Sequence, residues 1–268
     1  MTDVDSKHLS DIIPAASVIL MQDTPKGIEL FMVARNYEVD SFSGALVFPG
    51  GKVHPGDHNV VLRDYCCIDQ GLDDQDLALR VSAIREAFEE SGVLLARYRA
   101  TGDFIDEDDM NRLEPYRGQL ERGDIDLLAL VQQEDIELAT DQLVHFSNLV
   151  TPEGWARKRF DTHFYVVSMP RQYQLIHDGC ETISSVWDTP DGLLEDADNG
   201  RWNIVFPTRV NLSKIALFSQ AEQVVDACRD RAVEKITPEF MQDGDHAILN
   251  ISENAGFPFH HQRLYRPE

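Results

Sequence analysis

The feature that most constrains the fold is an amphipathic helix that carries one arginine and three glutamates on little more than a single turn. Apolar residues recur at the three-to-four spacing of an α-helix with one buried face, at Leu77, Val81, Ile84, Phe88 and Leu95. The glutamates stand at positions i, i+3 and i+4, as Glu86, Glu89 and Glu90. Like charges at this spacing destabilise an isolated helix, so the pattern indicates a compensating cation.

A hard divalent cation would compensate such a patch. Mg²⁺ prefers oxygen ligands, keeps several waters and combines a few carboxylates with substrate phosphates. Arg85 stands four residues before Glu89, where it can hold that carboxylate in place. Upstream, Pro49-Gly50-Gly51 ends a short apolar stretch, and two glycines let the backbone turn tightly and approach a ligand. Taken singly, the glutamate pair also fits a solvated helix face, and the two glycines fit a simple turn.

The acidic composition limits the partners. Among 268 residues, 24 are Lys or Arg and 47 are Asp or Glu, which gives a net charge of −23. Such a surface repels phosphate backbones and anionic lipid, so we expect no binding to nucleic acids or membranes. A phosphorylated substrate would then require a metal ion or a local cluster of basic side chains. The four cysteines form no CxxC pair, which favours reduced thiols in a cytoplasmic protein.

Strand and helix patterns alternate along the chain. Five segments have the apolar or alternating pattern of strands, at Ala15–Met21, Ile28–Arg35, Leu46–Phe48, Phe160–Val167 and Thr182–Trp187. Residues 54–76 are predicted to be mainly loop. Besides the helix that starts near Leu77, we expect helices over 106–137, broken near Pro115 and Gly118, and over Arg209–Val233. This mixture predicts an α/β or α+β fold.

The glycine element and the acidic helix together resemble the Nudix box, G-x5-E-x7-R-E-U-x-E-E-x-G-U, in which U is a bulky aliphatic residue. Gly51 opens the box, and its second half is filled in register by Arg85, Glu86, Glu89, Glu90, Gly92 and Val93. Asp57 stands where the first glutamate belongs, and Ala87 replaces a bulky residue. The spacer before Arg85 has 27 residues instead of 7, an insertion of 20.

The large spacer also resembles a subgroup of Nudix enzymes that cleave coenzyme A. The segments Gly44–Gly51 (GALVFPGG) and Arg159–Phe164 (RFDTHF) support this resemblance. It implies a Nudix-type α/β/α sandwich around a mixed sheet, built as one domain over residues 1–268. Three additions to that domain are expected: an inserted loop at about 58–77, a helical insertion at about 106–140 and a C-terminal helical extension at about 208–268.

The activity implied by the resemblance is metal-dependent hydrolysis of a diphosphate linkage in a nucleotide-derived small molecule. Coenzyme A or an acyl-CoA is the leading substrate, with phosphopantetheine and adenosine 3′,5′-bisphosphate as products. The resemblance places Mg²⁺ or Mn²⁺ on Glu86, Glu89 and Glu90, with the Gly51 carbonyl as a further ligand. The alternatives are hydrolysis of ADP-ribose or NADH, or a catalytically silent Nudix-like ligand sensor. A DNA-binding regulator is disfavoured because the segment after Arg209 is not strongly basic. A homodimer is compatible with the sequence.

Several further side chains are candidates for the site. Glu181 is the candidate for an additional carboxylate from outside the helix, and Arg85 belongs to the catalytic set. Basic side chains must offset an anionic substrate on this acidic chain, and the candidates are Arg35, Lys52 and Arg159. Arg35 and Arg159 also fit simple surface or pairing charges. We interpret His163, in an apolar strand, as a packed core histidine.

Overall fold

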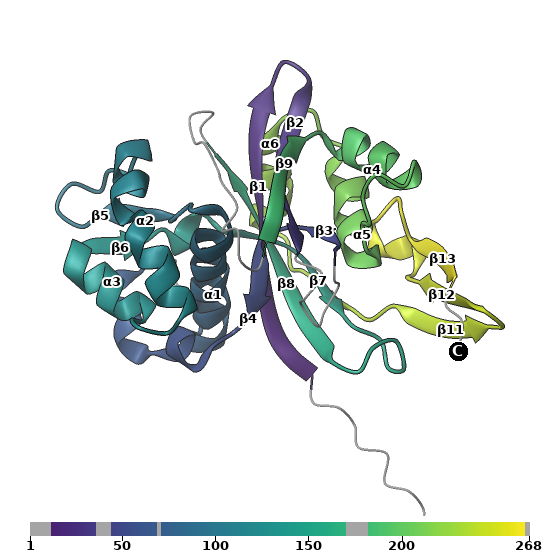
Figure 1. The fold of residues 1–268 in the computed structure, drawn as a ribbon, viewed down its shortest axis with the longest axis horizontal. Helices are drawn as coiled ribbons and strands as arrows, with labels where there is room; N and C mark the ends of the chain where they lie inside the picture. Colours follow the sequence, from purple (N-terminus) through teal and green to yellow (C-terminus); the bar gives the residue numbers. More distant parts are fainter. Residues whose placement is uncertain (1–11, 36–43, 69–70, 170–181, 266–268) are drawn as a thin grey trace, which may run out of the picture.

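A mixed β-sheet forms the centre of the molecule in the computed structural model, which describes residues 12–35, 44–68, 71–169 and 182–265 (Figure 1). Its strands are β1 (Ile12–Thr24), β2 (Gly27–Arg35), β3 (Leu46–Val47), β4 (Gly50–Lys52), β7 (Val144–Val150), β8 (Arg159–Ser168), β9 (Thr182–Asp188) and β10 (Lys235–Ile236). Their order is β10-β7-β8-β1-β2-β3, while β4 pairs with β1 and β9 pairs with β2. The β1–β8 and β10–β7 pairs are parallel and the others are antiparallel, so the sheet is mixed, as predicted.

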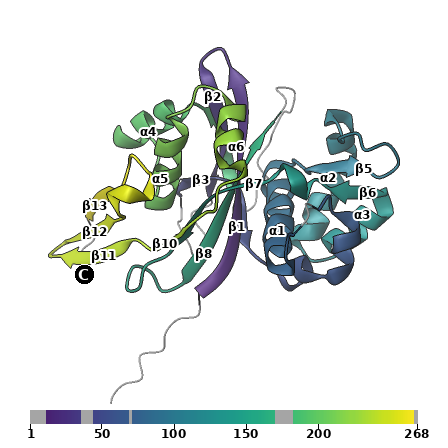
Figure 2. The ribbon, with the colours of Figure 1, turned by 180° about the vertical axis from the view of Figure 1, so that it is seen from behind.

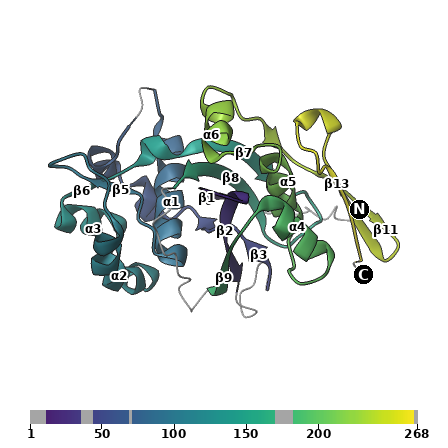
Figure 3. The same ribbon diagram turned by 90° about the horizontal axis from the view of Figure 1, so that it is seen from above.

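Helices cover both faces of this sheet, which confirms the predicted sandwich (Figure 3). One side holds α1 (Asp74–Ser91), α2 (Glu107–Glu121), α3 (Leu127–Glu134) and a small ribbon of β5 (Ala96–Tyr98) and β6 (Ile136–Leu138). The other side holds α4 (Pro190–Asp198), α5 (Phe206–Ile215) and α6 (Ala221–Arg229). A second sheet of β11 (Glu239–Asp243), β12 (His246–Asn250) and β13 (His261–Tyr265) lies beyond α5, far from α1 (Figure 2).

Strand β1 shows why its sequence is an uninterrupted apolar run. Val18 and Leu20 are buried in the core on the α1 side, whereas Ile19 and Met21 are buried in the core on the α5 side. A strand covered on both faces needs apolar residues at every position, so it lacks the alternation of a half-exposed strand.

Local signals at its two ends define α1. The side chain of Asp73 accepts a hydrogen bond from the backbone N–H of Asp76, which caps the N-terminus. Gly92, at φ 77°, ends the helix in the left-handed region that glycine adopts without a Cβ penalty. The predicted helix is confirmed over Asp74–Ser91, and it starts three residues before the first apolar position of the pattern, whereas Leu95, the last position of that pattern, lies beyond its end.

Two boundaries within the insertions differ from the prediction. The segment over 54–76, predicted as mainly loop, contains 3-10 helices at Pro55–His58 and Val60–Tyr65. The predicted break near Pro115 and Gly118 is also wrong, because α2 continues through both residues. Helix α2 buries Leu113 and Leu120, and this packing offsets the hydrogen bond that Pro115 removes.

The predicted C-terminal helical extension over 208–268 is wrong in its second half. The helical pattern over Arg209–Val233 corresponds to α5 and α6, which are separated at residues 216–220. Beyond them the chain forms β10 to β13 instead of helix. In β12, Ala247 and Leu249 are buried while their neighbours are partly exposed, which is the two-residue period of a strand.

Two expectations from composition concern the chain as a whole. None of the helices in the described ranges is long and apolar enough to cross a membrane. Cys66, Cys67 and Cys228 are free thiols, whereas Cys180 lies outside the described residues. Burial raises the pKa of Cys66 to about 12, which keeps this thiol protonated at neutral pH.

Candidate active site

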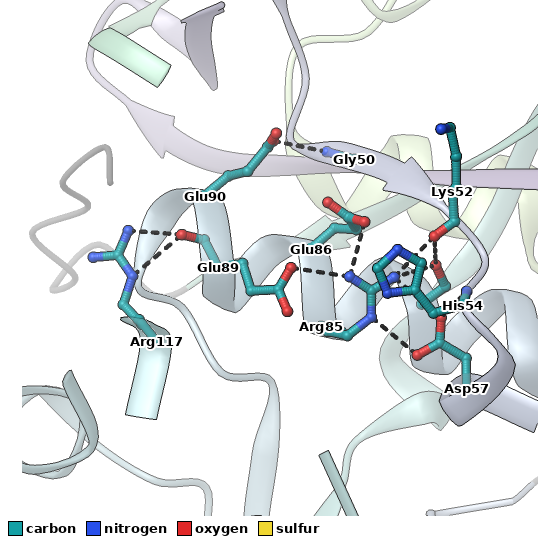
Figure 4. A network of polar contacts seen from close by, with 10 residues as sticks. Gly50, Lys52, His54, Asp57, Arg85, Glu86, Glu89, Glu90 and Arg117 are labelled. Atoms are coloured by element: carbon teal, nitrogen blue, oxygen red, sulfur yellow. Dashed lines mark hydrogen bonds and ion pairs between the residues drawn. The ribbon is translucent and has the colours of Figure 1, made fainter. Parts of the chain in front are cut away.

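Arg85 lies at the centre of a buried hydrogen-bond network on α1 (Figure 4). Its Nε and Nη2 donate to the two carboxylate oxygens of Asp57, at 3.0 and 3.1 Å. Its Nη1 donates to Glu86 Oε1 and to Glu89 Oε2, both at 2.9 Å. Nη2 also donates to the Lys52 carbonyl at 2.9 Å. One guanidinium, 5% exposed, therefore orients two of the three helix glutamates.

Asp57 has a structural role in this network. Besides the two contacts from Arg85, its Oδ2 accepts a hydrogen bond from the backbone N–H of His54 at 2.8 Å. The side chain is 4% exposed, and both of its oxygens accept hydrogen bonds from the protein. The aspartate at the position of the first box glutamate thus holds Arg85 from the side opposite Glu86 and Glu89.

The pKa values of the network reflect burial and mutual charge. Burial alone would lower the pKa of Arg85, but the carboxylates of Glu86, Asp57 and Glu89 raise it, so the guanidinium stays charged. Burial raises the pKa of Glu89 to about 7, and the charges of Glu86 and Asp57 act in the same direction, against the effect of Arg85. The site therefore concentrates more negative charge than one arginine neutralises.

Glu90 and the two glycines connect α1 to β4. Glu90 is 3% exposed, and its Oε2 accepts a hydrogen bond from the backbone N–H of Gly50 at 2.9 Å. A Cβ added to Gly51 would lie 2.4 Å from Glu86 Oε1, so only glycine permits this approach. The Gly50–Gly51 element predicted from the sequence therefore lies directly against the helix glutamates.

A cavity of about 410 Å³ opens at this point. On the α1 side its lining includes Gly51, Glu86, Glu89 and Glu90, together with Leu120 and Glu121 from the end of α2. On the opposite side it is lined mainly by apolar side chains, among them Trp155, Phe160, Phe164, Phe206, Pro238 and Leu249. These come from β8, α5, β12 and the connections near them, so the cavity extends from the charged helix to the side of the molecule that holds the second sheet.

The basic residues that were predicted to bind substrate do not all lie at the cavity. Arg35 and Lys52 line the cavity. The Nε of Arg35 is buried and meets no hydrogen-bond acceptor among the described residues. Arg159 instead is buried, and its Nε donates to the Thr151 carbonyl at 3.0 Å, whereas its neighbour Lys158 lines the cavity. Glu181, the predicted additional carboxylate, lies outside the described residues.

The donor set suits a hard divalent ion. Carboxylate oxygens from Glu86, Glu89 and Glu90 line one cavity, and the backbone of Gly51 lies against the first of them. Within the described ranges, no group of three or more His, Cys, Asp or Glu side chains has the geometry to hold a metal ion. Mg²⁺ commonly uses one or two carboxylates plus water and substrate phosphates, so this arrangement fits an ion whose coordination the substrate completes.

His163, predicted to be a packed core histidine, is hydrogen-bonded as expected but only partly buried, with 17% of its side chain exposed. One ring nitrogen lies 2.7 Å from Asn148 Nδ2 and the other lies 3.2 Å from His145 Nε2. The two imidazoles stack with ring centroids 5.0 Å apart. They lie on the face of β8 that carries Tyr165, away from the cavity-lining Phe164.

Sequence reasoning missed several residues of this site. Trp155 and Lys158 precede β8 in a connection without a motif, and Phe206 begins a helix more than 100 residues after the box. Arg117 comes from α2, and its guanidinium contacts the backbone of α1. No local spacing marks these side chains, because each reaches the site through tertiary packing.

Comparison with known proteins identifies the family of the chain. The family model described as the NUDT19 Nudix domain matches residues 66–215, more than half of the chain. The chain belongs to this Nudix family. It is thus a Nudix hydrolase, and Nudix hydrolases generally use divalent metal ions. The match includes α1 with its arginine and glutamates, whereas Gly51 and Asp57 lie before it.

Individual relatives have low sequence identity to this chain but align with much of its length. The acyl-coenzyme A diphosphatase NUDT19 of Xenopus laevis is 24% identical over 268 aligned positions, which cover 85% of this chain and 70% of the relative. The human protein of the same name is 27% identical over 168 positions, 60% of this chain and 44% of the relative. A crystal structure of a Nudix hydrolase from Alicyclobacillus acidocaldarius matches with a TM-score of 0.69 at 25% identity, over 81% of this chain and 97% of that one.

Proposed function

We propose that this Nudix hydrolase cleaves the diphosphate linkage of coenzyme A or an acyl-CoA. Water adds across the linkage, and the products are phosphopantetheine, or its acyl derivative, and adenosine 3′,5′-bisphosphate. The observation that carries this proposal is a cavity that has helix carboxylates on one side and an apolar wall on the other. Coenzyme A has a diphosphate next to a long, weakly polar arm, and an acyl group makes that arm more apolar.

The reactive end of the site is the α1 side. We assign Glu86, Glu89 and Glu90 as metal-binding residues, with the Gly51 carbonyl as a further ligand, and Mg²⁺ or Mn²⁺ as the ion. When bound, the ion neutralises diphosphate oxygens and lowers the pKa of the attacking water. Arg85 holds Glu86 and Glu89 in orientation, and the Gly50 N–H does the same for Glu90. These contacts fix the carboxylates before substrate arrives, which lowers the reorganisation needed for reaction.

Basic side chains around the cavity receive the anionic substrate. Arg35 is the strongest candidate, because the residue lines the cavity and its buried Nε has no acceptor among the described residues. An unpaired buried guanidinium N–H is costly, and a substrate phosphate oxygen would satisfy it. Lys52 and Lys158 line the same cavity and add positive charge on a protein of net charge −23. Arg159 is not assigned to the substrate, because its guanidinium contacts the Thr151 carbonyl.

The apolar wall distinguishes this proposal from the alternatives. In ADP-ribose the diphosphate is followed by a polar ribose, which presents less apolar area to this wall than an acylated pantetheine arm does. The named relatives from Xenopus laevis and human are acyl-coenzyme A diphosphatases, which supports the same choice. We therefore rank coenzyme A and its acyl derivatives above ADP-ribose and NADH, and an active enzyme above a silent sensor.

A panel of substrates tests the proposal. The purified full chain is incubated with coenzyme A, a medium-chain acyl-CoA, ADP-ribose and NADH, each with Mg²⁺, with Mn²⁺ and with a chelator. We expect metal-dependent cleavage of the two coenzyme A compounds, with both products identified by mass. Preferential cleavage of ADP-ribose or NADH would overturn the substrate assignment. Metal-dependent binding of these compounds without any cleavage would favour the ligand sensor.

A further inference from the structure

The inserted helix α2 reaches the metal-binding helix through one buried arginine. Arg117 is 6% exposed, although it belongs to a strongly acidic helix whose outer face is in solvent. Its Nε and Nη2 both donate to the backbone carbonyl of Glu89, at 3.3 and 3.0 Å. Figure 4 shows this guanidinium on the side of Glu89 opposite Arg85. Glu89 is thus held by two arginines, one at its side chain and one at its backbone.

The carbonyl of Glu89 needs such a partner because α1 ends two residues later. The last carbonyls of a helix lack intrahelical donors. In a continuing helix the N–H of Val93 would point at Glu89, but here it lies 3.4 Å from Ser91 Oγ. Gly92 turns the chain away, and a Cβ at this residue would lie 3.2 Å from Arg117 Nη1. The end of the box therefore leaves room for this guanidinium.

The remaining nitrogen of Arg117 is also fixed. Nη1 lies 3.2 Å from both carboxylate oxygens of Glu114, one turn earlier on α2. This contact holds the Arg117 guanidinium in the orientation in which it donates to the Glu89 carbonyl. A positive charge at a helix C-terminus is favourable, so the contact also stabilises the last turn of α1.

Arg112, on the same helix, provides a natural contrast. Its guanidinium pairs with Glu134 of α3 and with Asp109, and its side chain is 47% exposed. Arg112 therefore links α2 to α3 within the insertion, whereas Arg117 links α2 to α1. A role in the stability of the insertion would be shared by both arginines, but a role in placing Glu89 belongs to Arg117 alone.

We propose that Arg117 is a positioning residue that holds the last turn of α1, so that Glu89 and Glu90 face the metal and the substrate. The proposal rests on the metal site assigned above. It gives the α2 insertion a function in the reaction, and the insertion also lines the cavity through Leu120 and Glu121.

The test compares Arg117→Lys with Arg112→Lys in the full chain. Both substitutions conserve the charge, so long-range attraction of the metal is unchanged, while lysine cannot reproduce the planar two-nitrogen contact. We measure Mn²⁺ binding to the metal-free protein by electron paramagnetic resonance, and kcat and KM at saturating Mn²⁺. For Arg117→Lys we expect the Kd for Mn²⁺ to rise several-fold and kcat to fall roughly tenfold, with KM within about twofold. Arg112→Lys should match the unmodified protein in all three.

A structural readout accompanies the binding data. Hydrogen exchange of the backbone amides at residues 89–93 should accelerate in Arg117→Lys and stay unchanged in Arg112→Lys. Should Arg117→Lys fail to fold, Glu114→Gln takes its place, because it releases Nη1 and leaves the Glu89 contact present. We then expect a smaller rise in Kd for Mn²⁺ and a smaller fall in kcat.

Each other result overturns the proposal. Unchanged Mn²⁺ binding and kcat in Arg117→Lys, or in Glu114→Gln where that variant is used, would show that the contact does not position Glu89. Equal losses in the Arg117 and Arg112 variants would assign both residues to the stability of the insertion. Glu90→Gln distinguishes an error in the assigned metal site from an error in the role of Arg117 alone. If it leaves Mn²⁺ binding intact, the assigned metal site is wrong and the role of Arg117 fails with it; if it weakens binding and Arg117→Lys does not, only the role of Arg117 fails.

Discussion

On the α1 side of the cavity, Glu86, Glu89 and Glu90 each accept a hydrogen bond from a fixed donor. On the α5 side, the wall consists mainly of aromatic and aliphatic groups such as Trp155 and Phe206. Directional contacts hold the first set in one arrangement, which suits the chemistry of a charged linkage. Apolar contacts are non-directional, so under the proposed function the second wall would select by size and apolar area.

Strand β8 shows the same contrast within a single element. Phe160 and Phe164 face the cavity, whereas His163 and Tyr165, on the other face, belong to the side that packs against α1. Arg80 of α1 lies over the Tyr165 ring, 5.6 Å from its centroid. Alternate residues of one strand therefore contribute to the apolar cavity wall and to the opposite face, where His163 is hydrogen-bonded and Tyr165 is packed in the core.

The largest expected effect comes from removing one carboxylate on the α1 side. Glu90→Gln keeps the shape of the side chain but loses its charge, so we expect kcat to fall by about 10³-fold with little change in the thermal midpoint. Steady-state kinetics at saturating Mg²⁺ measures this. Glu195→Gln, at an exposed position of α4, is the control and should retain full activity. Near-normal turnover in Glu90→Gln would remove this residue from the metal site.

The next effect concerns the close approach of β4 to α1. Gly51→Ala places a Cβ 2.4 Å from Glu86 Oε1, so the carboxylate must move, and we expect kcat/KM to fall by about 10²-fold. Gly56→Ala is the matched control, because a Cβ there meets nothing within 4 Å. If both alanine variants behave alike, the contact between Gly51 and Glu86 has no part in activity.

A smaller effect is expected on the apolar side, and it concerns selectivity. Trp155→Ala should lower kcat/KM for a medium-chain acyl-CoA relative to free coenzyme A by roughly tenfold, because one apolar contact contributes about 1–3 kcal/mol. Cleavage of free coenzyme A should change little. Trp202→Ala, on the same side of the sheet but outside the cavity lining, is the control. An equal loss for both substrates would place Trp155 in general folding or in the reaction itself.

The smallest effect concerns His145 of β7, which stacks on His163 and Tyr165 of β8, and it is measured through pH. Burial lowers the pKa of His145 to about 4, and the neighbouring His163 acts in the same direction. The unfolded chain then binds a proton near pH 6.5 that the folded chain does not bind, so stability falls as the pH decreases from about 6.5 to 4. For this residue we expect a loss of about 1 kcal/mol in the free energy of unfolding between pH 7 and 5.5.

Urea denaturation at several pH values measures this loss. His145→Phe keeps an aromatic ring beside Tyr165 and removes the titrating group, so its stability should depend less on pH over that range. An identical pH dependence in the unmodified chain and in His145→Phe would contradict the assignment to this histidine.

Local patterns in the sequence predicted most of the fold that surrounds the reaction. The apolar period predicted α1, and the short apolar runs predicted β1, β2, β8 and β9, because these elements are determined by burial of their own residues. The box residues Arg85, Glu86, Glu89 and Gly51 lie together as their motif implies.

The predictions that were wrong failed because of tertiary contacts. Pro115 predicted a break, but burial of Leu113, Arg117 and Leu120 against the rest of the molecule keeps α2 intact. Arg159 is the first residue of a family-like segment, yet its guanidinium donates to the Thr151 carbonyl. The apolar wall and Arg117 depend on contacts between distant segments, which no single-sequence period can reveal.

The most direct test of the central claim is the identity of the products from an acyl-CoA. The unmodified chain and Glu90→Gln are incubated side by side with the acyl-CoA and Mg²⁺, and the products are identified by mass. We expect acyl-phosphopantetheine and adenosine 3′,5′-bisphosphate in equal amounts from the unmodified chain, and almost none from the variant. Cleavage at the thioester instead of the diphosphate, or no cleavage by the unmodified chain, would contradict this expectation.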